Sequence, residues 1–179
     1  MHEIPARSHI FVDESKAGAY YVVASALAAV DVSRARRNVQ RLLLPGQKRI
    51  HFTDEKDARR KQLLDAFAQL DVTVHVYLTK GMKDRQARPL CLERLVEDLL
   101  GAGADRLCIE RDDSTLVADK RILADCLRGR GDAFRYDFLK ASEEPLLWIS
   151  DAVAWCYQRG GQWKVRSKAL VAGVTTVSA

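Results

Sequence analysis

Short apolar segments alternate along the chain with segments whose apolar residues recur every three or four positions. This alternation predicts strands and helices in turn, because side chains repeat every two residues along a strand and about every 3.6 along a helix. The clearest period of two lies at residues 72–78, where valine and leucine alternate with threonine, histidine and tyrosine. We predict strands at residues 9–15, 20–27, 49–52, 72–78, 106–112 and 134–139.

The predicted helices begin at residues that cap helix N-termini and end near glycine or proline. Asp31 or Ser33 caps the first helix, Thr53 the second and Ser142 the last. Pro89 occupies the first turn of the third helix, where proline is tolerated. The helices are predicted at about residues 31–44, 53–70, 89–101, 114–128 and 142–158. Residues 162–179 receive no assignment.

The turn between the first two strands is short, so these strands are predicted to form an antiparallel hairpin. We expect a sheet of at least five strands with residues 9–15 at its centre. This central strand would pair antiparallel with residues 20–27 and parallel with residues 72–78. The fold class is therefore α/β, a mixed sheet with an N-terminal antiparallel hairpin, flanked by helices.

The composition places the protein among ordinary globular chains, with 179 residues of which 47% are hydrophobic and 30% charged. No linker or repeat divides it, so residues 1–179 are expected to form a single domain. No apolar run reaches the length of a membrane span and no secretory signal is evident, so a cytoplasmic protein without membrane contact is expected. The four cysteines include no C-x-x-C pair, which favours reduced core thiols over zinc ligands.

Two predicted strands run from apolar residues into acid. The first ends at Asp13 and Glu14, which alternate faces, so only one of them can point into a given cleft. The other strand carries Glu110 and Asp112 on one face. Turn residues are the more common explanation for an isolated Asp-Glu-Ser sequence.

Asp151 is the only charged residue between positions 146 and 156 of the last predicted helix. A helix that is apolar on nearly all sides is buried, and a buried carboxylate must be neutral, paired with a cation or directed into a polar cleft. A structural salt bridge to an arginine is as good an explanation as a functional site for this residue alone. Acids from separate elements are, however, what Mg²⁺ or Mn²⁺ requires. The candidate metal ligands are Asp13, Glu14, Glu110, Asp112 and Asp151.

The pattern of DES after a first strand, HFTDE, an acid-ended later strand and SDAVAW in a late helix resembles the bacterial domain-of-unknown-function family 3800. The resemblance covers about residues 8–158 and implies a ribonuclease H-like fold for the single domain. It makes Asp13 the first-strand aspartate and Asp151 the late-helix aspartate. The later strand acid is Glu110 or Asp112, and we favour Asp112 because metal sites in this fold collect at strand ends.

The resemblance also implies accessory residues around the site. His51 belongs to the His-Phe segment of the family, and Glu55 closes the same motif. Lys16 departs from the family pattern, in which glycine is usual. A lysine there would weaken ion binding or contact a phosphate.

Arginines gather on the polar faces of the first two predicted helices, and the formal charge of the chain is +5. Such a face is more often simply solvated, but it can also follow a phosphate backbone. The candidate nucleic-acid-binding residues are Arg34, Arg37, Arg41, Arg59 and Arg60.

Two functions follow from these observations. The first is a metal-dependent nuclease that hydrolyses nucleic acid by two-metal-ion chemistry, with Asp13, Asp112 and Asp151 as catalytic residues. The second is a noncatalytic module that binds nucleic acid or protein on the same scaffold. A phosphatase or phospho-acceptor site at Asp13 is disfavoured, because those folds lead from the first strand into a crossover helix rather than a hairpin. The sequence leaves the oligomeric state open.

Overall fold

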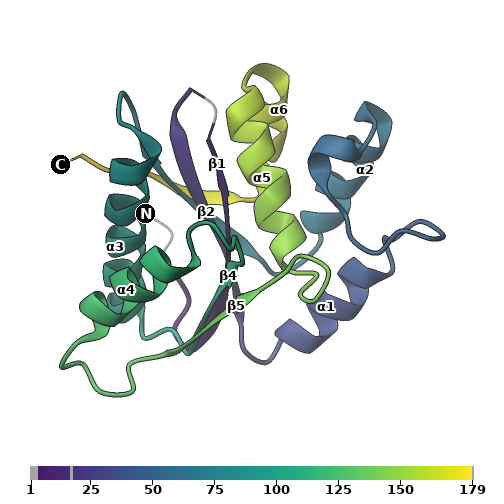
Figure 1. Cartoon of the computed structure of the whole chain (residues 1–179). Coiled ribbons are helices and arrows are strands. Elements are labelled where there is room, and N and C mark those ends of the chain that lie inside the picture. The colour runs from purple at the N-terminus through teal and green to yellow at the C-terminus, as the bar shows by residue number, and fades with distance from the viewer. Residues whose placement is uncertain (1–3, 17, 179) are drawn as a thin grey trace.

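The computed structural model describes residues 4–16 and 18–178, and within them a mixed sheet has helices on both faces (Figure 1). The sheet has six strands in the order β5-β4-β1-β2-β3-β6. Its strands are β1 (Ser8–Ser15), β2 (Tyr20–Ala28), β3 (Thr73–Thr79), β4 (Arg106–Glu110), β5 (Arg135–Leu139) and β6 (Val171–Thr176).

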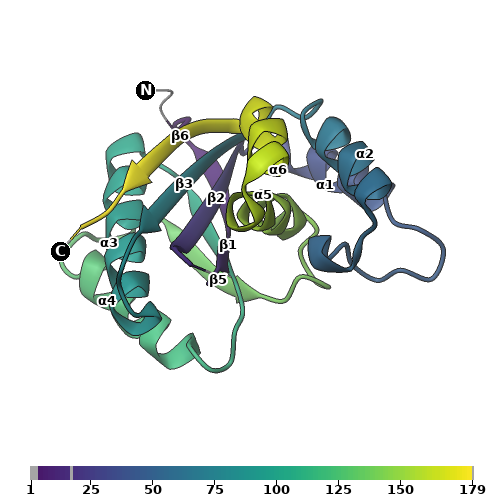
Figure 2. The same ribbon diagram turned by 90° about the horizontal axis from the view of Figure 1, so that it is seen from above.

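Two hydrophobic cores lie on opposite faces of the sheet. Helices α3 (Asp84–Ala102) and α4 (Leu116–Leu127) cover one face, and α5 (Leu147–Arg159) crosses the other (Figures 1 and 2). The core on the α5 face also includes residues from α1 (Val32–Gln40), α2 (Asp57–Phe67) and α6 (Gly161–Arg166). In β1, Phe11 belongs to the α5 core, whereas Ile10 and Val12 belong to the α3 core.

The prediction of a central first strand in an antiparallel hairpin is confirmed, since β1 pairs antiparallel with β2. The predicted parallel pairing of β1 with residues 72–78 is wrong. β3 instead pairs antiparallel with β2, and β4 lies parallel to β1 on its other side. The physical reason is that β2 is buried along most of its length and needs a strand at each edge, while β4 is apolar on both faces and suits a buried parallel position.

Several predicted element ends differ from the structure. Residues 49–51 are not a strand, and a short 3₁₀ helix covers Phe52–Asp54 before α2 begins at Asp57. Helix α3 begins at Asp84, so Pro89 lies in its second turn rather than its first. Helix α5 begins at Leu147 and does not reach back to Ser142, because Pro145 disfavours a helical conformation at Glu144.

The unassigned C-terminal residues form α6, a 3₁₀ helix at Ser167–Ala169 and the edge strand β6. β6 pairs parallel with β3. In the described part of the chain, no helix is both long and apolar enough to cross a membrane. The four cysteines are free, as predicted.

Candidate active site

One cavity brings together carboxylates from three elements of the fold. Asp13 of β1, Glu110 of β4 and Asp151 of α5 all line it. Its wall is completed by Glu14, Arg49, Ile50, His51 and Ala141. The cavity volume is about 170 Å³, which is room for small ions and several waters rather than for a nucleotide.

The strand register explains why Asp13 and Glu110 meet. β1 and β4 are parallel, with Val12 beside Ile109. The next residues of the two strands, Asp13 in β1 and Glu110 in β4, therefore also lie side by side. Asp13 alternates with Val12 and therefore shares the face of Phe11, which is the face that α5 covers.

A buried hydroxyl fixes α5 over this face. Ser150 Oγ donates a hydrogen bond to the main-chain carbonyl of Phe11 at 2.7 Å and lies 2.7 Å from Ser25 Oγ of β2. Asp151 follows Ser150 directly, so the contact that holds the helix on the sheet also places the aspartate at the cavity.

The carboxylates of the cavity repel one another. Burial raises the pKa of Asp13 well above its usual range, and the negative charges of Glu110 and Asp151 raise it further. Asp13 also shares a side-chain hydrogen bond with Glu110 that raises its pKa, while its Oδ1 accepts a hydrogen bond of 2.7 Å from the Glu14 amide. The site therefore favours a proton or another cation between these oxygens.

Asp151 is held by the segment that precedes α2. Its Oδ2 accepts a hydrogen bond of 2.7 Å from the Phe52 amide, and its Oδ1 lies 3.8 Å from His51 Nε2. Burial raises the pKa of Asp151 to about 6, although the Phe52 amide and the His51 charge lower it. Across residues 4–16 and 18–178 no arginine forms an ion pair with Asp151, so the alternative of a structural salt bridge to an arginine is wrong.

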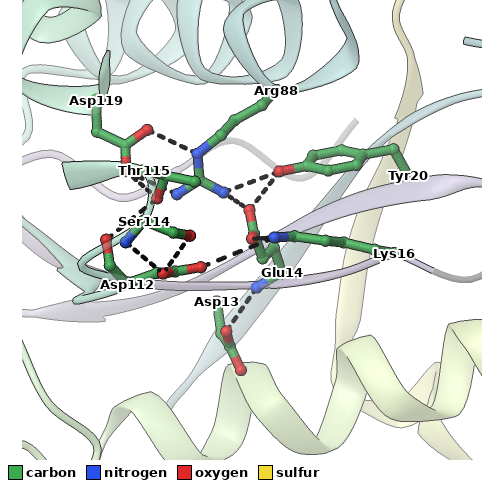
Figure 3. A network of polar contacts seen from close by, with 9 residues as sticks. All are labelled: Asp13, Glu14, Lys16, Tyr20, Arg88, Asp112, Ser114, Thr115 and Asp119. Atoms are coloured by element: carbon green, nitrogen blue, oxygen red, sulfur yellow. Dashed lines mark hydrogen bonds and ion pairs between the residues drawn. The ribbon is translucent and has the colours of Figure 1, made fainter. Parts of the chain in front are cut away.

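Glu14 forms part of the cavity wall, but its carboxylate points away from that of Asp13, toward Arg88 (Figure 3). Its carboxylate pairs with Arg88, accepts a hydrogen bond from the Tyr20 hydroxyl and lies 2.8 Å from Lys16 Nζ. Two cations therefore already compensate the Glu14 charge.

Arg88 connects this strand end to both helices of the α3 face. Its guanidinium makes two hydrogen bonds to Asp119 of α4, at 2.6 and 2.8 Å, and donates another to Tyr20 at 2.8 Å. Both Arg88 and Asp119 are buried. The sequence interpretation missed them, yet each sits one turn before a core leucine of its helix, and a charge on an apolar stripe was the available signal.

The preference for Asp112 over Glu110 does not match the positions of these residues. β4 ends at Glu110, and the chain then turns toward α4, so Asp112 lies outside the cavity with its side chain 42% exposed. Its Oδ1 accepts hydrogen bonds from the amide and the hydroxyl of Ser114 at 2.9 and 2.6 Å, and these lower its pKa. Lys16 Nζ is 3.8 Å from Asp112 and does not line the cavity (Figure 3).

Of the other predicted site residues, some line the cavity and others make structural contacts elsewhere. His51 lines the cavity, whereas Glu55 is buried and accepts a hydrogen bond from Gln47. Arg59 donates to the Leu42 carbonyl, and Arg60 donates to the Phe52 carbonyl at 2.9 Å, so both have structural contacts.

Arg34 and Arg37 of α1, and Arg41 directly after it, are exposed. Arg34 pairs with Asp31 at 2.7 Å and Asp71 at 3.3 Å. Arg37 and Arg41 do not line the cavity that holds Asp13, Glu110 and Asp151. Their contact with nucleic acid stays a prediction.

In the described residues, no group of three or more histidine, cysteine, aspartate or glutamate side chains is arranged to hold a metal ion. The cavity nevertheless offers carboxylate oxygens, the donors that Mg²⁺ and Mn²⁺ prefer. The donor set thus fits these ions chemically, while its three carboxylates are not positioned as a formed metal centre.

No protein-family model matches the sequence, and no curated protein matches it. Among solved structures, the chain is similar to a chain of the PCNA:RNase HII complex from Archaeoglobus fulgidus, with a TM-score of 0.55 and 14% sequence identity. The similarity covers 84% of this chain and 71% of that chain. At this identity the likeness establishes the fold alone. The protein therefore has a ribonuclease H-like fold, a mixed sheet that begins with an antiparallel hairpin and carries helices on both faces.

Proposed function

We propose that this protein is a metal-dependent nuclease that hydrolyses phosphodiester bonds in nucleic acid. The observation that carries the proposal is the convergence of Asp13, Glu110 and Asp151 from three elements on one cavity. The structural neighbour from Archaeoglobus fulgidus is named as RNase HII, and its nuclease class supports the proposal. The short motifs shared with family 3800 lead us to propose membership of that family as well.

In this mechanism Asp13, Glu110 and Asp151 would hold Mg²⁺ or Mn²⁺, with the Glu14 carboxylate held away from that of Asp13 by Arg88. The bound ions would supply an activated water and stabilise the leaving oxygen. The carboxylates themselves create the demand for a cation, because burial and mutual repulsion disfavour three unbalanced charges. Arg49 and His51 add positive groups to the cavity wall, with Arg49 Nη1 3.8 Å from Glu110 Oε1.

The test compares Asp151 with Glu110, which ends β4, and with Asp112, which lies in the turn after β4. We expect Mn²⁺ to raise the melting temperature of the parent, because a ligand that binds only the folded state stabilises it by mass action. Asp151→Asn and Glu110→Gln should abolish both this shift and hydrolysis of labelled RNA and DNA strands. Asp112→Asn should keep both, because Asp112 lies outside the cavity.

Loss of activity in Asp112→Asn with activity retained in Glu110→Gln would contradict the proposed ligand set. The second candidate function is a noncatalytic binding module, favoured by the lack of a formed metal group among the described residues. An absence of both Mn²⁺ stabilisation and hydrolysis in the parent would select that function.

A further inference from the structure

A second cavity, of about 450 Å³, adjoins the cavity lined by Asp13, Glu110 and Asp151, which we call the carboxylate cavity. The two cavities share Arg49, Glu110 and Ala141 as wall residues. The remainder of the second wall is formed by Lys48, Arg111, Lys140 and Ser142. Four cationic side chains thus surround this basic cavity, with Glu110 as its single carboxylate.

These cations come from three separate loops. Lys48 and Arg49 precede the 3₁₀ helix at Phe52–Asp54, Arg111 follows β4, and Lys140 follows β5. All four are exposed. The gathering depends on the fold, because β4 and β5 are parallel and their carboxyl ends meet at one edge of the sheet.

The positive charge of the basic cavity is largely uncompensated. In the part of the chain that the structure describes, neither Lys48 nor Lys140 forms an ion pair. Arg111 pairs at 2.6 Å with Asp113, whose side chain is 72% exposed, and surface pairs of this kind contribute little. Arg49 reaches Glu110 only at 3.8 Å. An anion in the cavity would therefore lower the repulsion among the four cations.

We infer that the basic cavity binds the phosphodiester backbone of the substrate strand next to the bond that is cleaved. The inference rests on the proposed nuclease function and names the surface that holds the substrate. The volume suits one nucleotide unit, and Arg49 and Glu110 connect the cavity to the carboxylates. Neither cavity is lined by the arginines that the sequence suggested in this region, Arg34, Arg37 and Arg41.

The test measures binding without metal, so that it is independent of catalysis. Fluorescence anisotropy with labelled single strands of about 20 nucleotides, one DNA and one RNA, gives the affinity in EDTA at several salt concentrations. We expect the double variant Lys48→Glu, Lys140→Glu to bind both strands at least about tenfold more weakly at low salt. The log-log salt slope should become shallower by about 1.4, because each single-strand phosphate contact contributes about 0.7.

The matched control is Lys61→Glu, Lys120→Glu, which changes the net charge equally at exposed positions outside both cavities. It should bind within about twofold of the parent. Equal weakening in the two double variants would show a general charge effect, and no binding of either strand by the parent would also overturn the inference.

The outcomes for the two proposals are separable. Weak binding by the Lys48, Lys140 variant together with a parent that never hydrolyses nucleic acid would keep the basic cavity and reject the nuclease. Unchanged binding by that variant together with Mn²⁺-dependent hydrolysis by the parent would reject the basic cavity and keep the nuclease.

Discussion

Asp151 sits in a helix that presents apolar residues to the core, and its position is costly when its charge is unbalanced. Its exposed side-chain fraction is 19%, and its hydrogen bond from Phe52 does not offset burial, so its pKa is raised to about 6. A raised pKa means that the folded protein binds this proton more tightly than the unfolded chain does. Asp151 therefore destabilises the metal-free protein once it ionises.

The contribution of Asp151 to the free energy of unfolding of the metal-free parent should fall as pH rises from about 4 to about 6, because over this interval the unfolded chain has lost the proton that the folded state still holds. Asp151→Asn cannot titrate and keeps an oxygen that can accept from the Phe52 amide. Over this interval we expect the free energy of unfolding of the variant to fall by on the order of 1 to 3 kcal/mol less than that of the parent. Urea unfolding in EDTA at several pH values measures the difference, and parallel pH profiles would contradict it.

At this scale the sequence identified Asp13 and Asp151 because each interrupts an apolar segment. Glu110 and Asp112 share a face of an ideal strand, and the sequence favoured Asp112, which the structure places outside the cavity. The strand ends at Glu110, and the hydrogen bonds of Asp112 to Ser114 belong to the turn that follows. Where a strand ends depends on its neighbours, so periodicity alone could not choose the acid.

At the scale of elements, the Glu14–Arg88–Asp119 network joins β1 to α3 and α4 (Figure 3). Thr115 Oγ1 adds a hydrogen bond of 3.1 Å to Asp119. The network lies on the opposite face from Asp13 and supports the end of the strand that carries it. Removal of one partner would leave a buried charge uncompensated.

Arg88→Met should destabilise the protein by about 3 to 5 kcal/mol, the usual cost of breaking a buried ion pair from one side. The double variant Arg88→Met, Asp119→Leu should recover part of this loss, because it removes the uncompensated carboxylate of Asp119. Arg94→Met is the matched control, since Arg94 lies on the same helix in an exposed pair with Asp98. Urea unfolding measures all three, and a loss below about 1 kcal/mol in Arg88→Met would contradict the structural role of the network.

Strands and helices with strong periodicity were predictable, and their pairing was less so. The short turn predicted the β1–β2 hairpin, but no local feature showed that β3 would add to β2 rather than to β1. The pairing depends on which strands have a neighbouring strand along both of their edges in the finished sheet. The C-terminal strand β6 was not predicted because Ala172 and Gly173 interrupt its short run of strand-forming residues.

At the scale of the whole molecule, the carboxylate cavity and the basic cavity lie at one end of the sheet. β1, β4 and β5 are parallel, so Asp13, Glu110 and Lys140 all occur at or near their carboxyl ends. Ligands of α/β sheets generally bind at this edge. The fold thus places an acidic site for cations beside a basic site for phosphates, although their residues are far apart in the sequence.

The most direct measurement of the proposed metal site is anomalous scattering from crystals of the parent soaked in Mn²⁺. We expect one or two peaks within about 2.5 Å of carboxylate oxygens of Asp13, Glu110 and Asp151, with small side-chain movements that complete the coordination. Crystals of Asp151→Asn should lose these peaks. An empty cavity at saturating Mn²⁺, or a peak at Asp112 with none at Asp13 and Asp151, would contradict the proposed metal site.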